Sequence, residues 1–128
     1  MVTQITEGVK ISVESVYQKE YSNPDNEHYM FAYRISIENL GTDTIQLLRR
    51  HWNIFDSNGT RREVDGEGVV GLQPVIAPGE SHEYMSGCNL QTDMGYMEGE
   101  YQMMREMDGL IFEADIPRFI LAAPYRLN

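Results

Sequence analysis

Apolar and polar residues alternate with a period of two along much of the chain, as expected for strands that bury one face. The alternating runs occupy residues 9–13, 29–37, 44–57 and 110–116. In the third run Leu48, Trp52 and Ile54 share the apolar parity, and Arg50 falls on the same side. We therefore expect four strands at these positions.

The methionine-rich segment 94–104 fits two patterns. Met94, Met97, Tyr101 and Met104 have helical spacing, whereas residues 95–103 also alternate as a strand would. Gly95 and Gly99 would each cost a helix about 1 kcal/mol relative to alanine. The segment is therefore predicted to be a strand.

Turn signals separate the extended segments. Asn58-Gly59 predicts a hairpin with a type I′ turn, in which both central residues have positive φ. Asp108-Gly109 marks a second hairpin, and residues 39–43 and 77–80 are turn clusters. Extended segments are expected at 60–64, 75–76 and 81–86, and a polar surface loop at 21–26. Pro117 and Pro124 are typical of an edge strand or an irregular tail.

Several short strands without a convincing helix predict an all-β, antiparallel sandwich or barrel. Residues 1–128 show no linker, repeat or low-complexity tract and are expected to form one domain. The hydrophobic fraction of 41% is too high for a disordered acidic tail.

Charge and targeting features narrow the class. Twenty acidic against ten basic residues give a net charge of −10, which disfavours nucleic-acid binding. The N-terminus lacks the pattern of a signal peptide, and no apolar run reaches the roughly 18 residues of a membrane span. The single Cys88 fits a reducing, cytoplasmic setting.

The string G-E-G-V-V-G places Gly66, Gly68 and Gly71 in a G-x-G-x-x-G pattern. In dinucleotide-binding folds this pattern opens a helix whose N-terminus holds the pyrophosphate. Here it leads instead into Leu72-Gln73-Pro74 and two β-branched residues. We expect these glycines to serve a bulge, a sharp bend or a close sheet contact.

Arg49, Arg50, Arg61 and Arg62 lie on the two arms of the Asn58-Gly59 hairpin. Arg49, Arg61 and Arg62 could form a patch for an anion or an acidic partner, because guanidinium groups suit phosphate and carboxylate. The favoured interpretation is a solvated face with local ion pairs to Asp56, Glu63 and Asp65. Arg50 shares the apolar parity, so we expect its stem to pack on Trp52 and its head to pair with a carboxylate.

Residues 93–115 carry seven acidic side chains against Arg105 alone, and we expect a solvated acidic face rather than a metal site. Cys88, His82, His28 and His51 stand in no catalytic or zinc-binding motif. The sequence thus offers no catalytic group, no metal site and no cofactor site.

Longer strings carry a resemblance to a known family. They are G-E-G-V-V-G-L-Q-P at 66–74, I-A-P-G-E at 76–80, R-H-W-N-I at 50–54 and I-P-R-F-I-L at 116–121. Together with Tyr84, Gly95, Gly99 and Tyr101, they resemble the ApaG family, also called CorD, over nearly the whole chain.

The resemblance implies a fibronectin type III or immunoglobulin-like sandwich, with no established catalytic residues. Bacterial relatives are linked genetically to cobalt and magnesium efflux and lie beside the diadenosine tetraphosphatase gene. The domain also recurs in a eukaryotic F-box protein and in a protein that interacts with DNA polymerase delta. The glycine motif of the family has prompted pyrophosphate-binding proposals, which map to Gly66, Gly68 and Gly71.

Two functions follow as hypotheses. The first is a non-enzymatic module that binds a protein partner through a sheet face or edge and the glycine segment, residues 66–71. The second is a binder of a pyrophosphate-containing nucleotide or a divalent cation. Exposed edge strands would also permit a homodimer.

Overall fold

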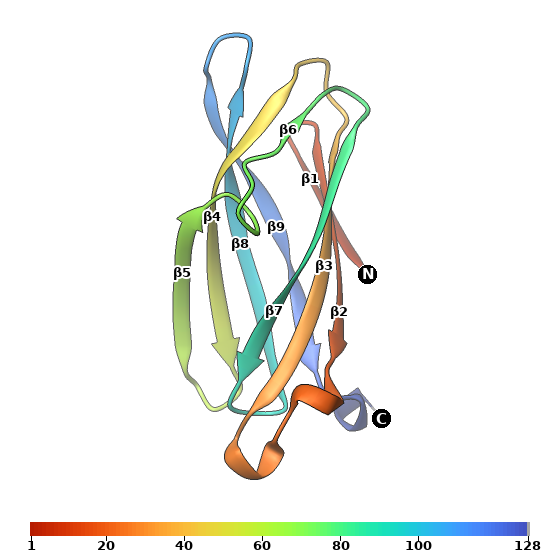
Figure 1. Ribbon diagram of the computed structural model, residues 1–128, viewed down its shortest axis with the longest axis vertical. Coiled ribbons are helices and arrows are strands. Elements are labelled where there is room, and N and C mark those ends of the chain that lie inside the picture. The colour runs from red at the N-terminus through yellow and green to blue at the C-terminus, as the bar shows by residue number, and fades with distance from the viewer. Residues whose placement is uncertain (128) are drawn as a thin grey trace.

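Two antiparallel sheets packed face to face form the protein (Figure 1). A computed structural model describes residues 1–127, and in that range the strands are β1 (Val2–Thr6), β2 (Val9–Tyr17), β3 (Tyr29–Asn39), β4 (Ile45–Asp56), β5 (Arg61–Glu67), β6 (Val75–Ile76), β7 (Ser81–Leu90), β8 (Met94–Arg105) and β9 (Ile111–Ala122). Short 3₁₀ turns occupy Lys19–Tyr21, Pro24–Asn26 and Pro124–Leu127. The fold class predicted from the alternation is confirmed.

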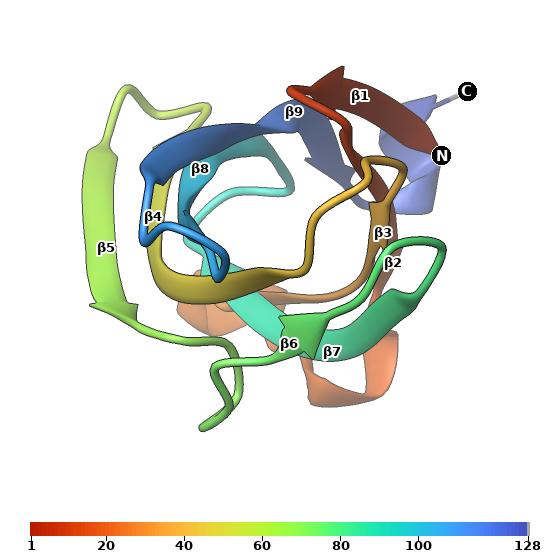
Figure 2. The same ribbon diagram turned by 90° about the horizontal axis from the view of Figure 1, so that it is seen from above.

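One sheet has the order β1-β2-β3-β7, and the other has the order β5-β4-β8-β9 with β6 paired to β4. Figure 2 looks along the strands and shows the two sheets enclosing a common interior. The ring centroid of Tyr33 in the first sheet lies 5.6 Å from those of Trp52 and Phe119 in the second, which are themselves 5.8 Å apart. This aromatic contact joins the inner faces of the two sheets.

The segment 94–104 belongs to β8, as its glycines predict. A Cβ at Gly99 would lie 1.9 Å from the carbonyl oxygen of His51, and one at Gly95 would lie 2.2 Å from that of Phe55. Only glycine lets β8 approach β4 so closely. The glycines therefore support the strand rather than interrupt a helix.

The expectation that Leu48 shares the buried side of the strand with Trp52 and Ile54 is wrong. A β-bulge between Leu47 and Arg49 shifts the register against β8. Leu47 consequently lies in the core and Leu48 is only partly buried, whereas Trp52 and Ile54 face inward as expected. A bulge inserts one residue and reverses the parity beyond it, and a period-two pattern cannot show this.

The Asn58-Gly59 hairpin forms, but its predicted turn type is wrong. Gly59 has φ of 93°, whereas Asn58 is not among the residues with positive φ, and Asp56 N donates to Thr60 O across a three-residue loop. The first hairpin has positive φ at both Glu7 and Gly8, as a type I′ turn requires. Its strand β1 is mostly exposed, so no alternating pattern indicated it.

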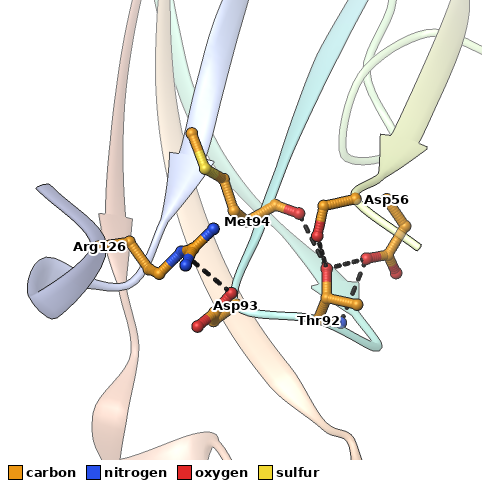
Figure 3. Close-up of polar contacts among 6 residues, drawn as sticks. Asp56, Thr92, Asp93, Met94 and Arg126 are labelled. Atoms are coloured by element: carbon orange, nitrogen blue, oxygen red, sulfur yellow. Dashed lines mark hydrogen bonds and ion pairs between the residues drawn. The ribbon is translucent and has the colours of Figure 1, made fainter. Parts of the chain in front are cut away.

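Asp56 is buried at the end of β4 and holds the turn between β7 and β8 (Figure 3). Its carboxylate accepts hydrogen bonds from the backbone N–H groups of Gln91 and Thr92, at 2.7 and 3.2 Å, and from the Thr92 hydroxyl. Beside it, Arg126 of the C-terminal turn lies 3.5 Å from Asp93. The Asp56 carboxylate thus accepts from the backbone N–H groups of the turn and does not pair with an arginine.

Within residues 1–127 no helix has the length and apolar character needed to span a bilayer.

Substituting Gly99→Ala is expected to lower the free energy of unfolding by about 2–3 kcal/mol, because the new Cβ collides with rigid backbone. Gly87→Ala is the matched control, since the nearest atom there is the flexible tip of Met30. Urea denaturation of both variants measures the difference. Equal stability of the two variants would contradict the close approach of β8 to β4.

Candidate functional site

The glycine segment folds into a small hairpin, and we call its residues 69–72 the apex loop. Val69 N donates to Leu72 O at 2.8 Å, and Leu72 N donates back to Val69 O at 3.0 Å. The two central residues, Val70 and Gly71, have φ of 47° and 77°. Both angles lie in the left-handed region, as a two-residue type I′ turn requires.

Gly66 and Gly68 are sites of close backbone approach. A Cβ at Gly66 would lie 2.7 Å from the Arg50 guanidinium, and one at Gly68 would lie 2.2 Å from the Leu72 carbonyl oxygen. Gly71 has open space around it and serves the turn alone. The segment is followed by a turn and β6, so the helix that a dinucleotide-binding motif needs does not follow it.

The bulged residue Leu48 fixes the base of the hairpin. Its carbonyl oxygen accepts hydrogen bonds from Gly68 N at 2.9 Å and from the Gln73 side-chain amide at 3.0 Å. The bulge in β4 thus presents one carbonyl oxygen to both arms of the hairpin.

Arg50 lies over Gly66 and holds the hairpin from inside. Its Nη1 donates to the carbonyl oxygens of Glu67 and Gly68, both at 3.0 Å. The prediction that Arg50 pairs with a carboxylate is wrong, because its guanidinium donates to backbone carbonyl oxygens instead. Arg50 is therefore a structural residue of this segment.

Two tyrosine hydroxyls meet in the interior near Arg50. Tyr84 of β7 and Tyr101 of β8 are hydrogen-bonded through their hydroxyl groups. Burial raises the pKa of both tyrosines, and the positive charge of Arg50 opposes this rise only in part. Both side chains are neutral at physiological pH and join the two sheets as a polar contact inside the core.

The structure does not bring Arg49, Arg61 and Arg62 into one patch. Arg49 lies on the outer face of its sheet, 3.9 Å from Glu67, and Arg61 lies over the Phe55 ring at 5.2 Å. Arg62 crosses to the other sheet, where it donates to Asn89 O and to the Cys88 sulfur. The expected ion pairs with Asp56, Glu63 and Asp65 do not form among the described residues.

A row of planar groups crosses the outer face of the five-stranded sheet. Arg61, Phe55, Tyr96 and Arg118 come from β5, β4, β8 and β9 in that order. The Phe55 and Tyr96 rings stack at 4.9 Å, and the Arg118 guanidinium lies 4.0 Å from the Tyr96 centroid. Only the register between four strands brings these residues together, so no pattern along the chain predicted the row.

The same face carries His51 between carboxylates. Its Nδ1 lies 2.5 Å from Glu100 and its Nε2 lies 3.5 Å from Glu63. The hydrogen bond to Glu100 chiefly raises the pKa of His51, and the charge of Asp65 adds to the rise. Among the described residues no group of three or more His, Cys, Asp or Glu could hold a metal ion.

The apex loop presents apolar side chains to solvent. Val69 is buried in the core, whereas Val70 and Leu72 are 63% and 57% exposed. A β-branched residue with positive φ is rare, because its side chain crowds the backbone there. Val70 is therefore both strained and exposed.

Comparison with known proteins places the chain among close relatives. Residues 19–105 match the family model of the ApaG domain. Protein ApaG of Escherichia coli is 53% identical over 91% of this chain and 92% of its own length, and that of Shigella boydii gives the same values. The crystal structure of a putative ApaA protein from Bordetella pertussis has a TM-score of 0.87 at 45% identity and covers 91% of this chain and 94% of its own.

Replacing Arg50→Met is expected to lower the free energy of unfolding by about 1–3 kcal/mol, because it leaves two carbonyl oxygens of the glycine segment without their donor. Amide hydrogen exchange at Gly68 and Val69 should accelerate in the same variant. Arg49→Met on the outer face is the control and should change stability by no more than about 0.5 kcal/mol. Unchanged exchange in Arg50→Met would refute the anchoring role.

The raised pKa of His51 gives stability that is fully present below its unfolded-state value and is lost as the pH rises through its folded-state value. The difference in unfolding free energy between the wild type and His51→Gln should therefore be larger at about pH 6 than at about pH 9. NMR titration of the imidazole measures the pKa directly. In Glu100→Gln the pKa of His51 should fall back toward its usual value, and no change there would contradict the assigned cause.

Proposed function

The chain belongs to the ApaG family, and we propose that it is a non-enzymatic binding module that contacts a protein partner through the apex loop. The observation that carries the proposal is Val70, an exposed β-branched residue held at φ of 47°. Strained backbone persists where the surrounding structure enforces it, and such residues cluster at binding and catalytic sites.

The apex loop has the features of a preorganised contact. Val69 anchors it in the core, and Arg50 and Leu48 fix its base through hydrogen bonds. Such a loop has little conformational freedom left to lose on association, which favours affinity. Val70 and Leu72 supply the apolar area that a protein surface would cover.

The glycine segment is poorly arranged for the alternative ligand, a pyrophosphate-containing nucleotide. The N–H groups of Gly68, Val69 and Leu72 all donate to carbonyl oxygens of the chain itself. A phosphate cradle depends on successive N–H groups that point at the anion. The arginines that could assist are divided between different surfaces, so the segment favours a protein contact.

The link to cobalt and magnesium efflux comes from the family resemblance alone. In the proposed function the protein would act in that process by binding a protein partner rather than by holding the cation.

Val70→Asn is expected to raise the free energy of unfolding by about 1 kcal/mol, because asparagine tolerates positive φ better than valine. The same substitution should abolish capture of the partner. Chemical denaturation measures the first effect, and quantitative affinity capture at physiological salt measures the second. A gain in stability together with a loss of binding is the expected signature of strain retained for recognition.

Two further variants complete this test. Leu72→Asn should also lose the partner. Ile5→Asn removes an exposed apolar side chain of β1, distant in the sequence from the apex loop, and should retain the partner. Capture of no specific protein by the wild type would overturn the proposal. Calorimetric binding of diadenosine tetraphosphate, ATP, Mg²⁺ or Co²⁺ tighter than about 1 mM would favour the small-ligand function instead.

A further inference from the structure

Strand β7 forms one edge of the four-stranded sheet and leaves part of its backbone unpaired. Gln18 N donates to Met30 O, which shows that the even-numbered residues of β3 make their backbone hydrogen bonds with β2. The odd-numbered residues of β3 therefore make theirs with β7. In this register the backbone N–H and C=O groups of the odd-numbered β7 residues point toward the free edge. Arg62 donates to the carbonyl oxygen of Asn89 from that side. Within the described residues, the backbone groups of Glu83, Met85 and Gly87 have no partner at this edge.

An apolar hollow adjoins this free edge on the outer face of the sheet. Its lining includes Tyr21, Met30, Ala32, Met85 and Gly87, and its volume is about 780 Å³. Met85 is 54% exposed, and the absence of a side chain at Gly87 opens the floor beside Met30. A side chain from a strand added next to β7 would enter this hollow from the edge.

Charge selects the kind of strand that would fit. Glu83 is exposed at one end of the unpaired stretch, and the Arg62 guanidinium closes the other end at Asn89. A basic residue opposite Glu83 would complement its carboxylate, and the net charge of −10 attracts a basic segment at longer range. The same net charge repels a second copy of this chain.

We propose that β7 accepts an extended segment of a partner protein as an added antiparallel strand, with a basic residue opposite Glu83 and apolar residues opposite Met85 and Gly87. The partner's backbone would pair with the free groups of β7, and its alternate side chains would fill the apolar hollow. The inference rests on the proposed function only in taking the partner to be a protein.

The test uses the full chain and a synthetic peptide, acetylated and amidated, of sequence Asn-Thr-Val-Thr-Leu-Thr-Arg. Antiparallel pairing sets its valine opposite Gly87, its leucine opposite Met85 and its arginine opposite Glu83. Titration followed by NMR should shift the amide resonances of Glu83, Met85 and Gly87, with a Kd of about 1 mM or tighter. Absence of shifts at β7 would overturn the proposal.

Methylated peptides test the backbone pairing without altering the protein. N-methyl groups on the valine and leucine face β7 and should weaken binding at least about tenfold, whereas N-methyl groups on two threonines face away and should leave it within about twofold. A peptide with glutamate in place of arginine should also bind more weakly. Equal affinity of the differently methylated peptides would refute strand addition.

Protein variants provide a second, independent test. Met85→Pro removes an N–H that faces the free edge and no bond to β3, so the fold should persist and peptide binding should be lost. Met85→Ala keeps the N–H and should still bind. Near-ultraviolet circular dichroism checks the fold of both variants.

Val70→Asn should bind the peptide as the wild type does, so failure at β7 and failure at the apex loop are distinguishable. Shifts at β7 that grow with protein concentration without peptide would identify a second copy as the occupant and overturn the assignment to a basic segment.

Discussion

A guanidinium group on the inner side of a β-sandwich is stable only where acceptors surround it, and Arg50 finds two of them in the carbonyl oxygens of Glu67 and Gly68. This requirement explains why the residue opposite Arg50 in β5 is a glycine, because any side chain at position 66 would displace the guanidinium. The same two hydrogen bonds hold the start of the tight hairpin that follows β5 against β4. One inward-facing arginine thus anchors the segment that carries Gly66, Gly68 and Gly71.

The alternation of apolar residues was sufficient for the fold class and for most strands, since burial of one face imposes a period of two. It failed where the backbone departs from that period, as at the bulge beside Leu48, or where a strand buries neither face, as in β1. The turn at Asn58-Gly59 shows a related limit. Its sequence suits positive φ at both residues, yet a three-residue loop forms, and the type I′ geometry occurs at Glu7-Gly8 and Val70-Gly71.

The candidate surfaces were harder to predict, because they depend on register between strands that are distant in the sequence. Arg61, Phe55, Tyr96 and Arg118 become neighbours only when four strands align. The opposite happens to Arg61 and Arg62, which are adjacent in the chain and lie on opposite faces of β5. Charge counted along the sequence therefore suggested a patch that the alternation of side chains across a strand divides.

Arg62 also has a consequence for the chemistry of the single thiol. Cys88 is buried beneath its guanidinium, and burial raises the pKa of the thiol despite the opposing effect of that charge. Oxidants and alkylating reagents attack the thiolate, which is scarce under such conditions. The native protein should therefore resist disulfide-linked dimerisation and thiol labelling in air, and any rapid modification of Cys88 would report separation of β5 from β7.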